Sequence, residues 1–311
     1  MKILVPNTIE LQLHADAEVV VYDVTADIPT GHRDAEVLVT WQNPADRLAS
    51  AARDLGALRL VQTLAAGPDA VLAAGFAPDV RICSGRSLHD GPVAEHALAL
   101  ILGAVRRLDL LHDAQQERRW DTEYIAAQSA PATRGAFTLA GAHVTIWGFG
   151  SIAGALAPLL QLLGAEVRGI ARSAGIRSGV EVHADDDIAA LLAETDVLVS
   201  LVPAAPETAD LADARVFGML KPGAVFVNVG RGATVDEEAL IDALESGALR
   251  AAAIDVMKTE PLGEDSPLWA APNLMITPHV AGNRPVGASA LIDDNVARLA
   301  AGEPLRNQVA R

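Results

Sequence analysis

The sequence is poor in cysteine, in positive charge and in long apolar runs. Its one cysteine, Cys83, cannot form an internal disulfide, which fits a reducing compartment. Lys and Arg number 24 against 40 Asp and Glu, giving a net charge of −16 with no basic stretch to offset it. Such a surface repels phosphate backbones and anionic headgroups, so we expect no nucleic acid or membrane partner. No apolar run reaches the roughly 18 residues of a spanning helix, and Pro6 breaks the first one. We therefore expect a cytoplasmic protein.

What the sequence does contain is an alternation of strand-like and helix-like segments. Half of the 311 residues are apolar, which is typical of a soluble protein with a large core, and the length favours two domains. Short apolar runs alternate with Ala- and Leu-rich stretches, a pattern typical of parallel sheets covered by helices. We predict an α/β protein with two doubly wound parallel-sheet domains. The expected strands are 2–6, 18–23, 36–41, 58–64 and 80–85, then 143–148, 166–171, 196–202, 224–230, 252–256 and 274–278.

Two helices are expected to link the domains. Residues 90–120 predict one long helix that starts near Gly91-Pro92, with Glu95 favouring the positive end of its dipole. Residues 285–305 predict a last helix that returns to the first domain.

A glycine-rich turn stands between the strand 143–148 and the next helix. It reads Gly148-Phe149-Gly150-Ser151-Ile152-Ala153, a G-x-G-x-x-A pattern. The first glycine permits a tight turn, the second lets a pyrophosphate approach the backbone, and the helix N-terminus offers free N–H groups. The alternative is a turn with only a structural role. We predict a dinucleotide site here, contacted by Gly148, Gly150, Ser151 and Ile152, which makes the second domain the cofactor domain.

Four polar residues follow apolar strands of the second domain, where ligands bind in open α/β sheets: Arg231, Asp255, Glu260 and His279. Hydride transfer to a 2-keto acid needs a cation for the carboxylate and carbonyl, a proton donor, and a carboxylate that orients the donor. Arg231, His279 and Glu260 can fill these roles in turn. Alternatively, Arg231 pairs with a surface acid, Glu260 only precedes a turn, and His279 is a loop residue. We expect the other seven histidines to be surface or packing residues, and no metal site.

Several longer segments together resemble the D-isomer-specific 2-hydroxyacid dehydrogenase family, in particular its glyoxylate/hydroxypyruvate reductase-like members. The resemblance covers nearly the whole chain and is carried by residues 60–71, 92–102, 148–154, 228–249, 252–269 and 276–282. It implies a flavodoxin-like substrate domain (1–95 and 286–311), a Rossmann cofactor domain (96–285), and a homodimer.

The resemblance also implies roles for single residues. Arg231, Glu260 and His279 match the catalytic arginine, glutamate and histidine of the family. Asp255 matches the acid near the nicotinamide carboxamide, and Val202 and Pro203 are further expected cofactor contacts. The backbone N–H groups of Ala66 and Gly67 match the loop that holds the substrate carboxylate.

Trp41 resembles a residue with which small-ketoacid reductases line their pocket, which favours glyoxylate or hydroxypyruvate; alternatively it is a lid without a role in selectivity. Phosphoglycerate and formate dehydrogenases are disfavoured, the first because it often carries an extra domain and the second because it uses Gln in place of the glutamate.

Two departures from the family pattern concern residues 283–285 and Trp147. Asn283-Arg284-Pro285 replaces the usual Thr and acid, which puts the local pocket wall and the start of the last helix in doubt. Trp147 is bulkier than usual, and we expect it to pack in the core. A function from another class, a dinucleotide-sensing binding protein of the same superfamily, would be expected to show a partner-binding extension or a surface motif, and the sequence shows neither.

Residues 171–173 indicate which dinucleotide is preferred. Ala171 stands where an NAD-binding chain carries the acid that binds the ribose hydroxyls, and Arg172 and Ser173 follow it. An acid would repel a 2′-phosphate, whereas a guanidinium and a hydroxyl can bind one. We predict that NADP(H) is preferred and NAD(H) is possible. The alternative is that Arg172 is only a solvent-exposed residue and leaves cofactor choice undecided.

Overall fold

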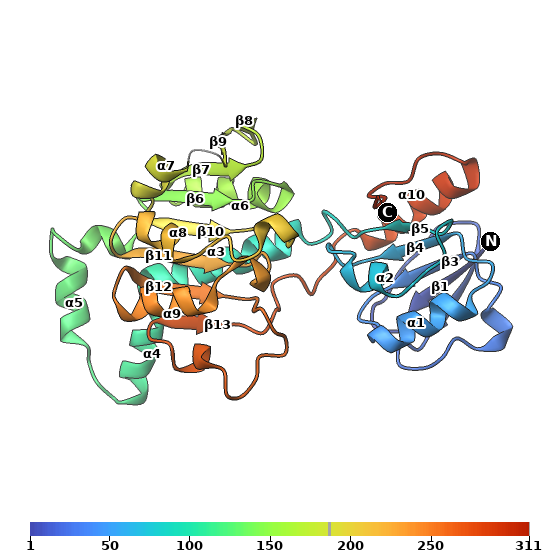
Figure 1. Cartoon of the computed structure of the whole chain (residues 1–311), viewed down its shortest axis with the longest axis horizontal. Helices are drawn as coiled ribbons and strands as arrows, with labels where there is room; N and C mark the ends of the chain where they lie inside the picture. The colour runs from blue at the N-terminus through green and yellow to red at the C-terminus, as the bar shows by residue number, and fades with distance from the viewer. Residues whose placement is uncertain (186–187, 311) are drawn as a thin grey trace. The chain divides into compact units, whose positions relative to one another are not determined.

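The computed structural model describes residues 1–185 and 188–310, which form two compact units (Figure 1). Unit 1 comprises residues 1–89 and 284–311, and unit 2 comprises residues 90–283. The boundaries expected from the sequence were 95/96 and 285/286. Residues 90–95 belong to unit 2 because they form the first turns of a helix in which Val93 and Ala94 are buried in that unit's core.

Unit 1 is built on a five-stranded sheet in the order β2-β1-β3-β4-β5, with all strand pairs parallel. This is the flavodoxin-like order. The strands are β1 (Lys2–Pro6), β2 (Glu18–Tyr22), β3 (Val37–Thr40), β4 (Leu60–Thr63) and β5 (Arg81–Cys83). The helices are α1 (Ala45–Asp54), α2 (Asp69–Ala73) and α10 (Ala288–Ala301), with a 3-10 turn at Thr30–His32.

Side chains alternate across a strand, and the central strands of this sheet bury residues on both faces. In β1, Leu4 packs in one core with residues of α1 and α2, whereas Ile3 and Val5 pack in the other with residues of α10. Helix α10, formed by a segment far away in the sequence, thus completes unit 1, as the sequence predicted.

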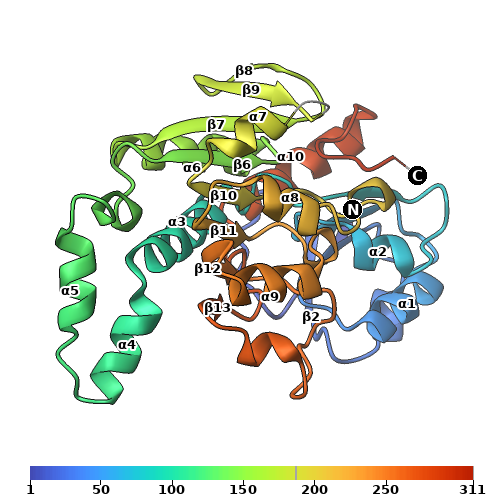
Figure 2. The same cartoon turned by 60° about the vertical axis from the view of Figure 1, so that its left-hand side comes forward.

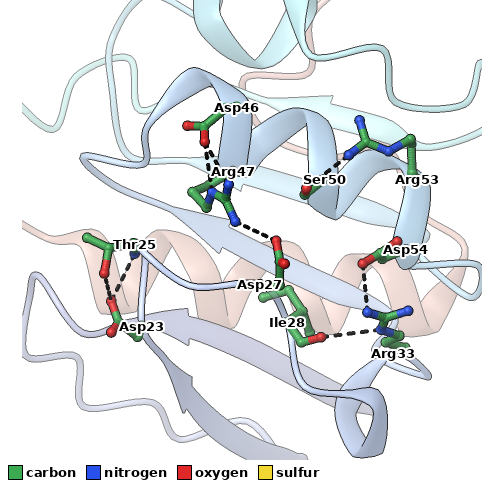
Figure 3. Close-up of polar contacts among 10 residues, drawn as sticks. All are labelled: Asp23, Thr25, Asp27, Ile28, Arg33, Asp46, Arg47, Ser50, Arg53 and Asp54. Carbon is green, nitrogen blue, oxygen red and sulfur yellow. Dashed lines mark hydrogen bonds and ion pairs between the residues drawn. The ribbon is translucent and has the colours of Figure 1, made fainter.

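The loop that follows β2 is fastened to α1 by ion pairs (Figure 3). Arg47 contacts Asp27 at 2.6 Å and its neighbour Asp46 at 2.8 Å. Arg33 reaches Asp54 at the end of α1, at 2.9 Å. Exposed pairs of this kind stabilise a protein by at most about 1 kcal/mol each, so they fix the position of the loop more than they stabilise the fold.

Unit 2 is built on an eight-stranded sheet in the order β13-β12-β11-β10-β6-β7-β9-β8; of these described strands, only β8 is antiparallel. Its strands are β6 (His143–Trp147), β7 (Glu166–Ala171), β8 (Gly175–Arg177), β9 (Val180–Ala184), β10 (Val197–Ser200), β11 (Ala224–Asn228), β12 (Leu249–Ile254) and β13 (Leu274–Ile276). Its helices are α3 (Asp90–Arg106), α4 (Leu108–Gln116), α5 (Thr122–Ser129), α6 (Ser151–Leu162), α7 (Ala189–Ala193), α8 (Ala214–Met219) and α9 (Glu237–Glu245). The 3-10 turns are Arg134–Phe137, Pro206–Thr208, Gly232–Thr234 and Pro267–Ala270.

Helices α3 and α6 cover one face of this sheet, and α7, α8 and α9 cover the other. In β6, Val144 and Ile146 face the first layer, while Trp147 lies in the second with 5% of its surface exposed. The bulk of Trp147 is therefore used in the core, as expected. The prediction of two doubly wound parallel sheets is confirmed.

The expected long helix over 90–120 was wrong, because it breaks at Arg107. This residue has a positive φ of 49° and separates α3 from α4. Its side chain is only 8% exposed and donates to Asp109 and, at 2.6 Å, to Asn273. The apolar spacing continues past the break, but the buried guanidinium sets the turn. Helices α4 and α5 then extend away from the sheet of unit 2 (Figures 1 and 2).

The hairpin β8–β9 was not predicted from the sequence. Ser178 and Gly179 form its tight turn, with φ of 50° and 76°, as a two-residue type I′ hairpin requires. The hairpin adds to the edge of the sheet beside β7 (Figure 2). Within the described part of the chain, no helix is long and apolar enough to cross a membrane.

Candidate active site

The glycine-rich turn joins β6 to α6 and leaves room for a phosphate. Gly148 has a φ of 96°, and a Cβ on it would lie 2.6 Å from the backbone of Leu201, so only glycine fits there. A Cβ on Gly150 would meet nothing within 4 Å. Ala153 is fully buried in the core beneath the turn. The open backbone at Gly150 and the N-terminus of α6 therefore fit the pyrophosphate of a dinucleotide.

The other expected contacts of this turn have defined surroundings. The Ser151 hydroxyl donates to the Asp90 carboxylate at 2.9 Å, and Ile152 is partly buried against the core. Val202 is 6% exposed and packs in the core, and the Pro203 carbonyl accepts from Thr208 at 2.8 Å. Ligand contacts at these four expected residues stay predictions.

The residues expected to determine whether NADP(H) or NAD(H) is preferred lie at the end of β7. Arg172 and Ser173 are both exposed. Ser173 is held by Arg177 of β8, whose Nη2 donates to the Ser173 carbonyl at 2.9 Å and to its hydroxyl at 2.8 Å. Arg177 was not among the residues predicted for this site, although a second arginine lies only five positions after Arg172 in the sequence.

Arg231 lies in the loop that follows β11, and side chains fix the backbone of that loop. The Asn228 amide donates to the Arg231 carbonyl at 3.2 Å and accepts from the Gly230 N–H at 3.0 Å. The Thr234 hydroxyl also donates to the Arg231 carbonyl, at 2.7 Å. The guanidinium itself donates to the Gly230 carbonyl at 2.7 Å, and no carboxylate contacts it within residues 1–185 and 188–310. Pairing of Arg231 with a surface acid is therefore not observed.

The loop of Arg231 packs directly on the segment that carries Glu260. A Cβ on Gly232 would lie 1.9 Å from the carbonyl carbon of Met257. Nearby, the Lys258 N–H donates to the Glu237 carboxylate at 2.7 Å. The strands involved, β11 and β12, are neighbours in the sheet. The structure thus brings Arg231 and the Glu260 segment to the same edge, as parallel strands predict.

Glu260 and His279 form a hydrogen-bonded pair. One carboxylate oxygen of Glu260 lies 2.6 Å from His279 Nδ1, and the other accepts from the Met257 N–H at 3.0 Å. An ionised carboxylate can only accept, so with Glu260 in that form Nδ1 carries the hydrogen and Nε2 is left to exchange a proton with a ligand. The two side chains remain 33% and 47% exposed, so a ligand can reach them. This is the geometry of a general acid–base pair.

Asp255 holds the loop of His279 in place. Its carboxylate is buried and accepts from the N–H groups of Val280 and Ala281, at 2.9 and 3.0 Å, and from the Thr277 hydroxyl at 2.6 Å. The Asp255 carbonyl accepts from the His279 N–H at 2.8 Å, and His279 has a positive φ of 52°. Asp255 therefore supports the unusual backbone of the His279 loop, a role that the sequence did not indicate. Its expected contact with a nicotinamide stays a prediction.

His96, one of the seven histidines expected to be surface or packing residues, lies beside Asp255. His96 Nε2, on α3, lies 3.0 Å from the Thr277 hydroxyl and 3.4 Å from the Asp255 carboxylate. It is placed there because α3 packs against β11 and β12. The spacing of apolar residues in α3 shows which face of the helix packs on the sheet. It does not show which strand end a given side chain reaches.

In unit 1, the residues expected to bind substrate surround the loop after β4. Trp41 is half-buried and stacks on His89, with ring centroids 5.4 Å apart. His89 is 4% exposed, and its Nε2 lies 2.7 Å from the Leu64 carbonyl. The N–H groups of Ala66 and Gly67 have no acceptor in the described part of the chain, so they are available to a carboxylate.

Comparison with known proteins identifies the family. Residues 98–281 match the model of the D-isomer specific 2-hydroxyacid dehydrogenase, NAD binding domain. The chain belongs to this family. Its resemblance to the family, drawn from the sequence, is confirmed, and the chain is an oxidoreductase of the 2-hydroxyacid class.

Individual members of the family match over almost the whole chain. Glyoxylate/hydroxypyruvate reductase A of Serratia proteamaculans is 34% identical, over 88% of this chain and 86% of the relative. The structure of an NADPH-dependent glyoxylate/hydroxypyruvate reductase from Sinorhizobium meliloti, in complex with NADP and sulfate, matches with a TM-score of 0.81 at 29% identity, covering 99% of this chain and 97% of the other. A D-isomer specific 2-hydroxyacid dehydrogenase from Xanthobacter autotrophicus Py2, in complex with NADPH and MES, matches with a TM-score of 0.80 at 31% identity, covering 99% and 97%.

Two further features of this 2-hydroxyacid dehydrogenase concern metal binding and the departure at residues 283–285. No group of three or more His, Cys, Asp or Glu side chains could hold a metal ion among the residues that the structure describes. The family departure at Asn283-Arg284-Pro285 lies where the chain passes from unit 2 to unit 1. In unit 1, the Val286 N–H donates to the Leu88 carbonyl at 2.8 Å, which fixes the entry to α10.

Proposed function

We propose that this protein reduces small 2-keto acids such as glyoxylate and hydroxypyruvate, with NADPH as the preferred cofactor. The observation that carries the proposal is the 2.6 Å contact between His279 Nδ1 and the Glu260 carboxylate, which leaves Nε2 free to donate a proton. The names of the Serratia and Sinorhizobium relatives support this substrate class.

The residues divide the reaction between them. NADPH supplies the hydride to the carbonyl carbon when it is bound. His279 Nε2 donates a proton to the carbonyl oxygen, and the Glu260 carboxylate stabilises the charged ring and fixes its orientation. Arg231 binds the substrate carboxylate and polarises the carbonyl through its planar donor fork. The N–H groups of Ala66 and Gly67 are further donors to that carboxylate. Trp41 favours a substrate with a small side chain.

The preference for NADP(H) rests on the end of β7. Ala171 replaces the acid that would bind ribose hydroxyls and repel a phosphate, and Arg172 and Ser173 are exposed there. The Xanthobacter and Sinorhizobium structures, which contain NADPH and NADP, support the same preference. NAD(H) can bind the same turn without the phosphate contact.

The reaction is tested with purified protein, NADPH or NADH, and a panel of 2-keto acids. We expect NADPH to be oxidised faster, and His279→Ala to lower kcat by about 100- to 10,000-fold, the usual contribution of a general acid, with NADPH affinity nearly unchanged. His112→Ala, which removes an exposed histidine of α4, is the control and should turn over normally. A protein that binds NADPH but reduces no 2-keto acid would instead be the dinucleotide-sensing binding protein.

We also propose a cytoplasmic homodimer. Unit 2 carries exposed apolar side chains on α4, on α5 and between them, which is unusual for a monomer surface; Trp120 is 83% exposed and Ile125 is 45% exposed. Light scattering should give the mass of two chains, and Trp120→Glu should lower it towards one.

A further inference from the structure

The hairpin β8–β9 places a second arginine beside the glycine-rich turn. Arg177 ends β8 and pairs with Val180 across the tight turn of the hairpin. The hairpin also lies close to α6, because a Cβ on Gly154 would meet the Ser178 hydroxyl at 2.8 Å. The half-buried Arg177 side chain reaches back to the Phe149 carbonyl, to which Nη1 donates at 3.1 Å. One guanidinium therefore links the glycine-rich turn to the segment that follows β7.

The contact with Ser173 fixes what the serine hydroxyl can do. Arginine has only donors, so in the 2.8 Å bond from Arg177 Nη2 the Ser173 oxygen must accept. The hydrogen of that hydroxyl is then free to donate elsewhere. The second bond of Nη2, to the Ser173 carbonyl at 2.9 Å, holds the backbone as well. Arg177 thus presents Ser173 as a hydrogen-bond donor, which is the role that a bound phosphate requires.

Within the part of the chain that the structure describes, no ion pair neutralises the charge of Arg177. In residues 1–185 and 188–310, no carboxylate forms an ion pair with Arg177 or Arg172, whereas Arg168 of β7 pairs with Glu194 at 2.6 Å. Among the described residues, two arginines without a carboxylate partner on one short segment stand out in a chain with a net charge of −16. Three of the five N–H donors of Arg177 are used in the bonds described, which leaves two for an anion.

We propose that Arg177 determines cofactor specificity, by positioning Ser173 as a donor and by adding a second positive charge to the site for the 2′-phosphate of NADP(H). This inference rests on the proposed function of Arg172 and Ser173, but it concerns a residue on a different strand. It predicts that the preference for NADPH depends on the hairpin as well as on the end of β7.

The test measures dissociation constants of NADPH and NADH by fluorescence titration for single variants of the whole protein. Hydrogen bonds to charged groups contribute enough that Arg177→Ala should weaken NADPH about 10- to 100-fold, and NADH less than about threefold, because NADH lacks the phosphate. Arg177→Lys keeps the charge but lacks the planar fork that contacts both Ser173 and Phe149. Its dissociation constant for NADPH should therefore lie between those of the wild type and Arg177→Ala. Arg168→Ala, with the same loss of charge on β7, should leave the ratio of the two constants unchanged.

Adenosine 2′,5′-bisphosphate and AMP give a second readout that needs neither nicotinamide nor turnover. Only the bisphosphate should bind more weakly to Arg177→Ala. If Arg177→Ala weakens both cofactors equally, or neither, Arg177 merely braces the glycine-rich turn and the inference is overturned. Should that variant fail to fold, Arg177→Gln, which is closer in size, decides on the same ratio.

The variant Arg172→Ala distinguishes a failure of the role of Arg177 from a failure of the proposed NADP(H) preference. If Arg172→Ala lowers the NADPH preference and Arg177→Ala does not, only the role of Arg177 fails. If neither dinucleotide binds the wild-type protein, the proposed function fails first.

Discussion

Gly232 is the point where the loop of Arg231 touches the backbone of the Glu260 segment, and Gly232→Ala should separate the two. A Cβ there would lie 1.9 Å from the Met257 carbonyl carbon and 2.0 Å from its oxygen, whereas ordinary contacts begin at 3.4 Å. The difference, 3.4 − 1.9 = 1.5 Å, is the approximate shift that the loop must make. No side-chain rotation can relieve the clash, because both partners are backbone atoms.

The shift displaces Arg231, which is the residue next to Gly232. Overpacking of this kind costs about 1–3 kcal/mol of stability, which a domain of this size tolerates. A displacement of about 1 Å at a catalytic group can lower the rate about 100-fold. We therefore expect Gly232→Ala to remain folded, to bind NADPH with nearly normal affinity, and to lose about 100-fold in kcat/KM for the 2-keto acid.

Initial rates, NADPH titration and urea unfolding measure these three quantities. Gly218→Ala is the matched control: Gly218 lies in α8 of the same unit and has no atom within 4 Å of its would-be Cβ. It should gain up to about 1 kcal/mol, since alanine favours helices, and should turn over like the wild type. A folded Gly232→Ala protein with a rate within about twofold of wild type would refute the reasoning.

Two further predictions concern buried groups. Asp255→Asn replaces an acceptor by a donor facing the N–H groups of the His279 loop; leaving one of them unsatisfied should cost about 1–3 kcal/mol in urea unfolding and lower kcat, and unchanged values of both would contradict this role. Burial raises the pKa of the Cys83 thiol from 9.0 to about 12, so a thiol reagent at pH 8 should label it only in urea. Because the folded pKa is the higher one, its contribution to stability is complete below about pH 9 and is lost as the pH rises to about 12; rapid labelling of the native protein would contradict its burial.

The parallel sheets could be predicted from the sequence because their central strands are buried on both faces and appear as continuous apolar runs. The hairpin β8–β9 could not, because only Val180 and Val182 of its longer strand are fully buried, which is too short a pattern to distinguish from a loop. The break at Arg107 depends on its bond to Asn273, a contact between residues far apart in the chain. Local spacing carries no information on such a contact.

The candidate site divides in the same way. Glu260 and His279 could be placed together because each follows one of two neighbouring strands, β12 and β13. The support of the His279 loop by Asp255, and the reach of Arg177 to Ser173, depend on side-chain direction and loop geometry. Neither follows from the order of residues alone.

The order of strands in unit 2 also bears on how this enzyme can change. The residues proposed to recognise the cofactor phosphate lie on β7 and β8 or between them, and the proposed catalytic residues follow β11, β12 and β13, with β10 and β6 between the two groups. Substitutions at well-separated sites have nearly additive effects on free energy. The choice between NADP and NAD can therefore change independently of the catalytic residues. Residues 171–184 could be exchanged for an NAD-type segment, in the laboratory or during evolution, without changing the proposed proton-transfer residues.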